Sequence, residues 1–385
     1  MADAAITVFP VGNGDTILIK LTDDATVILD CNIRYDAHDE ENDECYDVHS
    51  HLIEELKRDE NDRPFVDAFT LTHADQDHCR GFQTSFHTGA PDEYELEEDE
   101  PIKILMAEIW FSRRIFSNFD DCPLCDDAKA FKKEVERRIA LYQSGDSKRD
   151  LPGNRLRVIG YGESEETEGL DGITTAPGNS LNLINGSAKD DFSFFVHAPF
   201  KRGEEDSDVE QRNNSSIVLQ ACFKVDSVDR ACLILLGGDA PWDLWRALYR
   251  KSAEADLQWD LLLSPHHCSW SFFNNTPYED NKEPQQSSLD VLGRHREGAF
   301  VVASSKPIKD DDCNPPHYAA KQEYVKVVGE AKFFCVGENP SEETPEPLMF
   351  TMTSAGPVRD ESSTPKRVSA AAAVSQTLRS PRHYG

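Results

Sequence analysis

The chain has 385 residues, and its 71 acidic against 40 basic side chains give a formal net charge of −31. A surface this acidic is unfavourable for broad, sequence-independent binding to phosphate backbones. Ten cysteines occur without a secretory leader, the start is polar and no apolar run reaches the length of a membrane span. We therefore expect a cytoplasmic protein in a reducing compartment, with no association with a membrane.

Strands and helices are predicted in turn through the first half of the chain. Apolar runs predict an opening hairpin near residues 6–31 and later strands at 65–70, 102–111, 155–159 and 192–196. Residues 48–56 are predicted to form a helix. Apolar side chains at helical spacing indicate a second, amphipathic helix that packs on a sheet face, namely Phe131, Val135, Ile139 and Tyr142. His197 follows the last of these strands, and as a lone imidazole it is expected to be structural rather than to line a pocket.

Four metal-binding side chains follow the predicted strand at 65–70 within six residues. They are His73, Asp75, Asp77 and His78. Alternate residues of an extended chain face opposite sides, so this spacing makes two neighbouring metal pockets feasible. The alternative is a polar loop after a buried strand. Four potential ligands at this spacing favour the metal, because charged and imidazole groups are costly to gather without a compensating ion.

Two later segments also place ligand types at strand ends. The apolar run 231–236 predicts a buried strand that ends before Asp239, and Pro241 is suited to begin a helix. The short run 261–263 predicts another strand, which ends before His266 and His267. A carboxylate and an imidazole from adjacent strand ends would close a binuclear site, with Asp239 bridging two cations through its two oxygens.

The last part of the chain changes character. A strand is predicted at 298–305 and a helix at 318–325, and from about Pro357 onward Ser, Thr, Pro and Ala dominate. We expect one domain over residues 1–350 and a flexible low-complexity tail over 351–385. The acidic loops near 93–100 and 203–208 and this tail are candidate docking surfaces for a protein partner, although solvated loops are the simpler interpretation. Cys122 and Cys125 resemble half of a zinc knuckle, but no second cysteine pair occurs at the expected spacing.

The order of these motifs resembles the metallo-β-lactamase superfamily. His-x-Asp-x-Asp-His at 73–78, Gly-Asp-Ala at 238–240 and Pro-His-His at 265–267 are most similar to the soluble domain of the ComEC competence (DNA-uptake) proteins. The opening segment 11–31 and the Asn-Ser strand at 213–219 add to the likeness. The resemblance implies an α/β fold of the four-layer αββα metallo-β-lactamase type.

The chain departs from that family at two places. Cys268 stands where the family usually has Gly after the paired histidines, and we expect its thiol to pack rather than to bind metal. The late His-Pro pair of the family is reversed at His317, which leaves the role of this residue open.

The resemblance also implies a ligand set. One cation is expected on His73 and Asp75 and the other on Asp77, His78 and His266, with Asp239 between them. Whether His266 or His267 is the ligand stays open. A water shared by the two cations would lose a proton and attack a phosphorus or carbonyl centre. Asp75 stands where many members carry His, which makes the first pocket rich in oxygen. Mn²⁺ therefore competes with Zn²⁺, and Mg²⁺ is a further candidate.

Other side chains are expected to act on the substrate. Asp77 would alternatively orient the attacking hydroxide, and Lys306 and His317 are candidates for protonating a leaving group. Substrate contacts are expected from Ser215, Ser216 and His267.

Three functions remain open from the sequence. The resemblance implies a metal-dependent phosphodiesterase or nuclease, with a phosphodiester substrate that includes nucleic acid and a metal-bridging hydroxide as nucleophile. A small-molecule hydrolase of the same fold, acting on a phosphoester, lactone or thioester, suits the acidic surface better. The third is a metal-stabilised subunit activated by a partner protein, against which the intact ligand set argues. A shared fold by itself does not choose among them.

Overall fold

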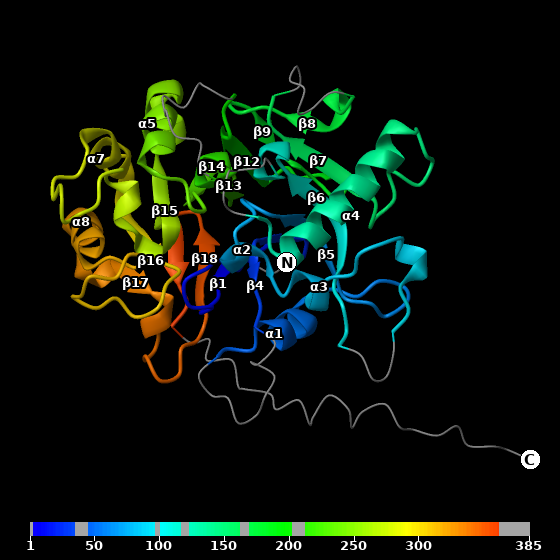
Figure 1. Ribbon diagram of the computed structural model, residues 1–385, viewed down its shortest axis with the longest axis horizontal. Helices are drawn as coiled ribbons and strands as arrows, with labels where there is room; N and C mark the ends of the chain where they lie inside the picture. The colour runs from blue at the N-terminus through cyan, green and yellow to red at the C-terminus, as the bar shows by residue number, and fades with distance from the viewer. Residues whose placement is uncertain are drawn as a thin grey trace, which may run out of the picture.

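Two mixed β-sheets lie face to face at the centre of the molecule (Figure 1). The computed structural model describes residues 3–34, 45–96, 101–116, 123–161, 169–201 and 212–361. The predicted α/β class is confirmed in this part of the chain. None of the helices in these ranges combines the length and apolar character needed to cross a bilayer.

The first sheet has the strand order β19-β18-β1-β2-β3-β5-β6-β7-β8. Strands β3, β5, β6, β7 and β8 run parallel, whereas β19, β18, β1, β2 and β3 pair in antiparallel fashion. The bounds are β1 Ala5–Val8, β2 Ile17–Lys20, β3 Thr26–Leu29, β5 Phe65–Thr70, β6 Leu105–Phe111, β7 Arg155–Ile159, β8 Thr174–Thr175, β18 Leu348–Thr353 and β19 Gly356–Arg359.

The second sheet has the order β17-β16-β15-β14-β13-β12-β9. Here β14, β15, β16 and β17 are parallel, and β9, β12, β13 and β14 are antiparallel. The bounds are β9 Ser180–Leu181, β12 Phe192–Ala198, β13 Val218–Val225, β14 Val228–Leu236, β15 Trp259–Leu263, β16 His295–Ala303 and β17 Phe333–Cys335. Three short strands lie outside this ladder, namely β4 Cys31–Asn32, β10 Leu183–Ile184 and β11 Ser187–Ala188.

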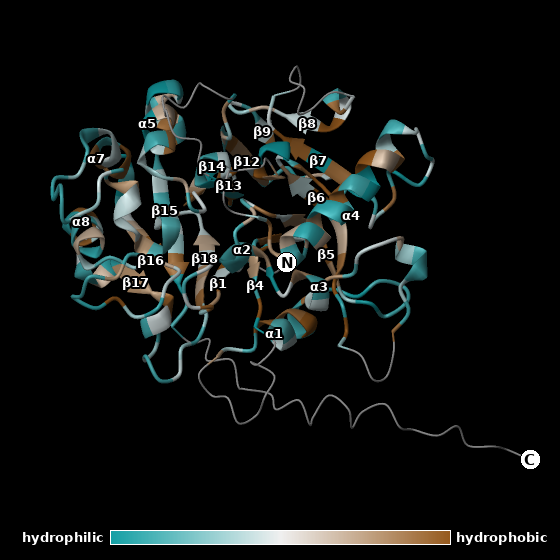
Figure 2. Ribbon diagram, in the orientation of Figure 1, coloured by the Kyte–Doolittle hydropathy of each residue, from teal (hydrophilic) through white to brown (hydrophobic). Residues whose placement is uncertain are grey.

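Helices cover the outer face of each sheet. Between the sheets, Trp110 of β6 packs edge to face on Phe194 of β12, with 5.5 Å between ring centroids. Outside the first sheet lie α1 Val48–Glu55, α3 Phe82–Ser85 and α4 Asp126–Gln143, and outside the second lie α5 Trp242–Lys251, α7 Gln286–Leu292 and α8 Tyr318–Val328. In Figure 2 the central strands are largely brown and the helices carry teal faces. Strands covered on both sides must be apolar on both sides, which explains their continuous apolar runs.

Most of the predicted elements are confirmed. The strand bounds at 65–70 and 155–159 match β5 and β7, and the predicted helices correspond to α1, α4 and α8. The opening hairpin is β2–β3, to which β1 adds a further strand.

The predicted start of the C-terminal tail at residue 351 is wrong. Strand β18 pairs with β1, and its alternate residues Leu348, Phe350 and Met352 are buried in the core between the sheets. Burial of every second residue holds this segment in the sheet between β1 and β19, whatever the composition that follows. The remainder of the predicted tail, residues 362–385, lies outside the described residues.

Candidate metal centre

The predicted ligands meet at the carboxyl ends of parallel strands from both sheets. In the first sheet Asp30 follows β3, and residues 73–78 follow β5. In the second sheet Asp239 follows β14, and His266 and His267 follow β15. Carboxyl ends of parallel strands share one edge, so two packed sheets bring residues far apart in sequence to one place.

Two short helical segments present the ligands. Helix α2 (Gln76–Cys79) carries Asp77 and His78 in a single turn. Segment α6 (Pro265–Cys268) contains a left-handed turn, with φ of 51° at His266, 53° at His267 and 65° at Cys268. Left-handed backbone costs a non-glycine residue about 1–2 kcal/mol, and strain of this kind is typical of functional sites. Cys268 packs in the apolar core beside α5 and α8, as predicted.

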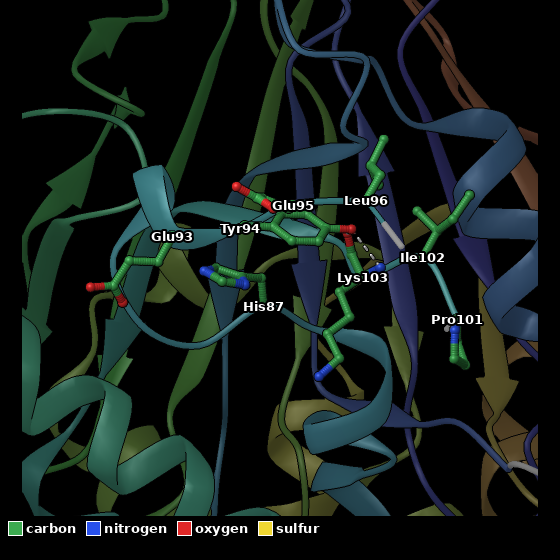
Figure 3. Close-up of a pocket in the computed structure, with 8 residues that line it drawn as sticks. All are labelled: His87, Glu93, Tyr94, Glu95, Leu96, Pro101, Ile102 and Lys103. Atoms are coloured by element: carbon green, nitrogen blue, oxygen red, sulfur yellow. Dashed lines mark hydrogen bonds between the residues drawn. The ribbon is translucent and has the colours of Figure 1, made fainter. Parts of the chain in front are cut away.

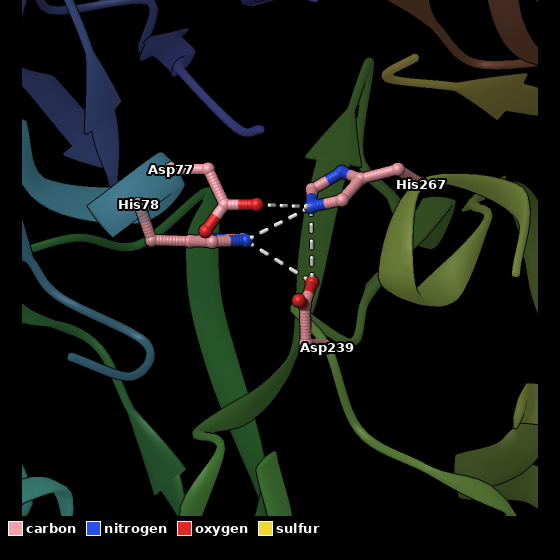
Figure 4. Close-up of side chains that lie close together, drawn as sticks. All are labelled: Asp77, His78, Asp239 and His267. Atoms are coloured by element: carbon pink, nitrogen blue, oxygen red, sulfur yellow. Dashed lines mark hydrogen bonds and ion pairs between the residues drawn. The ribbon is translucent and has the colours of Figure 1, made fainter. Parts of the chain in front are cut away.

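Four imidazoles direct Nε2 toward the carboxylate of Asp239. On one side, Oδ2 lies 3.4 Å from Nε2 of His73 and 3.5 Å from Nε2 of His266. On the other side, Oδ1 lies 3.0 Å from Nε2 of His78 and 3.3 Å from Nε2 of His267. Figure 4 shows this second side, where Asp77 from α2 faces His267. Asp239 therefore divides the site into an Oδ2 lobe and an Oδ1 lobe.

Each imidazole is held from behind through Nδ1. The contacts join His78 to the Asp30 carboxylate at 2.7 Å, His267 to the Ser304 carbonyl at 3.0 Å, His266 to the Ser271 hydroxyl at 2.9 Å and His73 to the Thr72 hydroxyl at 3.1 Å. For His73, His78 and His266, a proton on Nδ1 toward such an acceptor leaves Nε2 with a free lone pair, whereas Nδ1 of His267 also faces the N–H of Gly14 at 3.2 Å. This arrangement is usual for histidines that bind metal, because the rear partner sets the tautomer and the ring orientation.

The electrostatics of the centre fit divalent cations. Asp77, His78, Asp239 and His267 offer ligand atoms that all lie within 4.8 Å of one another, and so do Asp30, His73 and His78. Asp239 Oδ1 and His73 Nε2 are buried and have no hydrogen-bond partner in the described structure. A buried carboxylate surrounded by four imidazole nitrogens is satisfied only when positive charge, from protons or from a cation, lies between them.

Protons can supply that charge at part of the site. Burial by itself lowers the pKa of His78, but the Asp239 and Asp30 carboxylates raise this pKa well above its ordinary value. Burial also opposes ionisation of Asp239, yet the surrounding imidazoles hold its pKa well below the usual range. A cation would compete with these protons, so metal binding should release protons and weaken as pH falls.

The two remaining carboxylates differ in their partners. Asp75 accepts a hydrogen bond from the buried Arg212 guanidinium through Oδ1, while its Oδ2 lies 3.8 Å from Nε2 of His73. Asp77 is 34% exposed, and its Oδ2 lies 3.6 Å from Nε2 of His267. Burial raises the pKa of Asp77, but the hydrogen bond with His267 and the charge of His78 lower it below its ordinary value. Asp77 is therefore an ionised group that faces the opening of the site.

His266, for which the sequence left His267 open as the alternative ligand, lies in the other lobe. It was expected beside Asp77 and His78, but His267 occupies that Oδ1 lobe and His266 lies in the Oδ2 lobe with His73. His267, which was predicted to contact substrate, is 1% exposed and has the position of a ligand. The left-handed turn causes the exchange, since it rotates the two successive side chains away from the directions of extended chain.

The second-tier candidates lie at varying depth around the centre. Ser215 donates its hydroxyl to the carbonyl of Arg212, and the buried Ser216 hydroxyl has no partner in the described structure. Lys306 is exposed, and its backbone N–H donates to Asn13. His317 lies outside the Asp/His cluster. Its ring packs against Tyr278 and Trp270, which differs from the position expected of a group that protonates a leaving group at the metals.

Two carboxylates of the centre were not assigned a role from the sequence. Asp30 accepts hydrogen bonds from His78 and from the Thr72 hydroxyl and N–H. Asp15 is buried, 3.7 Å from Nδ1 of His267 and 3.9 Å from Nδ1 of His78. Asp30 follows the apolar run 27–29 at a strand end, which is the same signal that identified Asp239. Asp15 follows a loop and carries no such signal.

A separate pocket beside strand β6 shares no residue with the metal centre (Figure 3). It is lined by His87 and Tyr94, whose rings stack with 4.6 Å between centroids, and by residues on both sides of 97–100. Residues 97–100 of the first predicted acidic loop, all of 203–208 and Cys122 lie outside the described residues. The Cys125 thiol lies 3.4 Å from the Cys79 thiol.

His197 lies away from the cluster and has a structural setting, with Nδ1 3.3 Å from the Ser252 hydroxyl. Burial lowers its pKa to about 3. The pKa of a histidine in an unfolded chain is about 6.5, so below that pH the unfolded chain gains the proton and the folded chain does not. The free energy of unfolding therefore falls by about 1.4 kcal/mol for each unit by which the pH is lowered. We expect His197→Gln to reduce the loss of unfolding free energy between pH 6.5 and 5 by about 2 kcal/mol, measured by urea denaturation.

Ser252→Ala is the matched control for this prediction. It removes the hydroxyl but leaves the imidazole buried, so it should keep the pH dependence of the parent protein. The same pH dependence in His197→Gln and the parent would contradict the prediction.

Neither models of known protein families nor curated protein sequences match this chain.

Proposed function

We propose that this protein is a metal-dependent hydrolase with a binuclear centre, and that it acts as a phosphodiesterase or nuclease. The proposal includes the metallo-β-lactamase type of αββα sandwich and kinship with the soluble domain of ComEC-like proteins. It draws on the motif order at residues 73–78, 238–240 and 265–267 and on the two-sheet sandwich that brings these segments together.

One observation carries the proposal. Four imidazoles, each held through Nδ1, present Nε2 to the two oxygens of one buried carboxylate. A structural polar cluster would satisfy itself with hydrogen bonds, whereas here buried ligand atoms remain without partners. Two lobes that share Asp239 suit two cations with a common ligand.

Some residues of the centre would bind the cations, and others would orient the attacking water or fix the ligand side chains. His73, Asp75 and His266 would hold one ion, Asp77, His78 and His267 the other, and Asp239 both. Divalent cations bound there would supply Lewis acidity and an acidified water for attack on phosphorus. Asp77 is ionised and partly exposed, so as the alternative to binding the ion it would orient the attacking water by accepting a hydrogen bond from it. Asp30 and Ser304 fix the rings of His78 and His267.

The type of metal follows from the donors. The Oδ1 lobe has two imidazole nitrogens with two carboxylates, and the Oδ2 lobe offers the same donor types. Mixed nitrogen and oxygen sites of this kind accept Zn²⁺ and Mn²⁺, and Mg²⁺ is the harder alternative.

The test is hydrolysis after exchange of the metal. Protein stripped with chelator and reloaded with Mn²⁺, Zn²⁺ or Mg²⁺ is assayed on single- and double-stranded DNA, on RNA and on bis-p-nitrophenyl phosphate. We expect cleavage of phosphodiesters that is lost on stripping and restored on reloading. The matched control is protein taken through the same steps and returned to buffer without metal.

Other outcomes separate the alternatives. Turnover of the small diester alone would favour a small-molecule phosphodiesterase, which the net charge of −31 suits better than a long polyanion does. Bound metal without turnover of any phosphodiester would overturn the proposal, and would favour an esterase, a lactonase or a subunit activated by a partner.

A further inference from the structure

A small pocket next to the metal centre gathers two cationic side chains. It has a volume of about 150 Å³ and is lined by residues that include Gly12, Asn32, Arg34 and Lys306. This is smaller than the roughly 300–1,000 Å³ of sites for whole drug-sized ligands, so it suits one functional group rather than a complete molecule.

Arg34 and Lys306 converge on Gly12. A Cβ built on this glycine would lie 3.4 Å from Nη2 of Arg34 and 3.7 Å from Cε of Lys306. Gly12 has φ of +82°, a conformation that side chains rarely adopt. The glycine thus leaves open the space that both cationic side chains border.

The charge in this pocket is not balanced by the described part of the chain. No carboxylate within residues 3–34, 45–96, 101–116, 123–161, 169–201 and 212–361 forms an ion pair with Arg34 or Lys306. Glu342, which also lines the pocket, lies 3.4 Å from the Lys309 ammonium. Within the described residues, two cations that lie close together without an ion pair mark a place where an anion is favoured.

The loop at residues 11–14 lies between the pocket and the Oδ1 lobe, since Val11 and Gly12 line the pocket and Gly14 contacts His267. Asn32 donates its side-chain amide to the carbonyls of Val11 and Asn13, and the N–H of Gly14 lies 3.2 Å from Nδ1 of His267. Lys306 comes two residues after Ser304, and the Ser304 carbonyl contacts the same imidazole of His267. A molecule whose anion occupies the pocket would thus have to extend past this loop to reach the metal centre.

We propose that the Arg34–Lys306 pocket binds a terminal phosphate of the substrate, so that the enzyme prefers phosphodiesters that carry a second, monoester phosphate. The inference rests on the proposed function. A planar guanidinium matches two phosphate oxygens, and an ammonium adds a point charge to a third. This mode of binding is also compatible with an acidic protein surface. The pocket binds only the terminal phosphate of the substrate, so the protein does not need to bind a long phosphate backbone.

The first experiment measures binding without turnover. Inorganic phosphate is titrated into metal-free protein, so that the metals do not bind the probe, and binding is followed by calorimetry. We expect saturable binding that Arg34→Gln and Lys306→Gln each weaken at least about tenfold, because each removes a charge-assisted hydrogen bond. Lys326→Gln, at an exposed position of α8 outside the pocket, is the matched control and should bind like the parent. Equal binding by the parent and both pocket variants would overturn the inference.

The second experiment measures selectivity in the Mn²⁺-loaded protein. Dinucleotides with a 5′-phosphate, a 3′-phosphate or no terminal phosphate are compared by kcat/KM. We expect one phosphorylated form to exceed the unphosphorylated form at least about tenfold, and Lys306→Gln to remove most of that ratio. Equal values for all three substrates would contradict the inference.

The two arms separate this inference from the proposed function. Phosphate binding that needs Arg34 but is accompanied by no hydrolysis would refute the function and leave the anion site intact. Lys306 is exposed, so Lys306→Gln should fold and carries the test even if Arg34→Gln does not.

Discussion

Asp239→Ala is expected to reduce metal-dependent hydrolysis by on the order of a thousandfold or more in kcat/KM, since cations bound there contribute several kcal/mol to the transition state. Asp239 is 2% exposed, and its two oxygens each face two imidazoles. Without it, neither lobe retains the shared anionic ligand. The metal content of the purified variant should fall together with its turnover of bis-p-nitrophenyl phosphate.

Two further variants make this prediction specific. Asp243 comes four residues after Asp239, beside Arg246 and outside the metal-binding cluster. The variant Asp243→Ala should therefore keep both metal content and activity. Asp30→Asn leaves the ligands in place but weakens the orientation of His78, so we expect an intermediate loss of about 10–100-fold. Full metal content and activity in Asp239→Ala would exclude a shared carboxylate.

Arg138→Ala is expected to lower the free energy of unfolding by about 3–5 kcal/mol. Arg138 lies in α4 and is 2% exposed. Its guanidinium donates to Glu134 at 2.8 Å, to the carbonyl of Arg155 at 2.9 Å and to the carbonyl of Met106 at 2.9 Å. One side chain thus attaches α4 to β6 and β7, and its loss leaves a buried carboxylate with fewer donors. Urea denaturation measures the change.

The matched control is Glu136→Ala, in the same helix but exposed, which should change stability by less than about 0.5 kcal/mol. Arg137 also donates to Glu134, so some compensation is built in. An unfolding midpoint for Arg138→Ala equal to that of Glu136→Ala would show that the buried network does not hold α4.

The local pattern of apolar and polar residues determined which segments form helices and strands. It also showed where metal-binding residue types follow the end of a strand. A buried strand must be apolar, so the runs at 65–70, 231–236 and 261–263 predict β5, β14 and β15. The polar residues that follow each run then mark a strand end. That rule identified His73, Asp75, Asp77, His78 and Asp239. It would also have indicated Asp30, which follows β3.

Only the tertiary structure decided how these groups share the centre. The choice between His266 and His267 depends on the left-handed turn at 266–268, which no pattern of apolar residues encodes. The positions of Asp15 beside His267 and of Arg34 beside Lys306 depend on contacts between segments about 250 residues or more apart in the chain. Periodicity records which face of an element is buried, whereas the partners across a site are set by how two sheets pack.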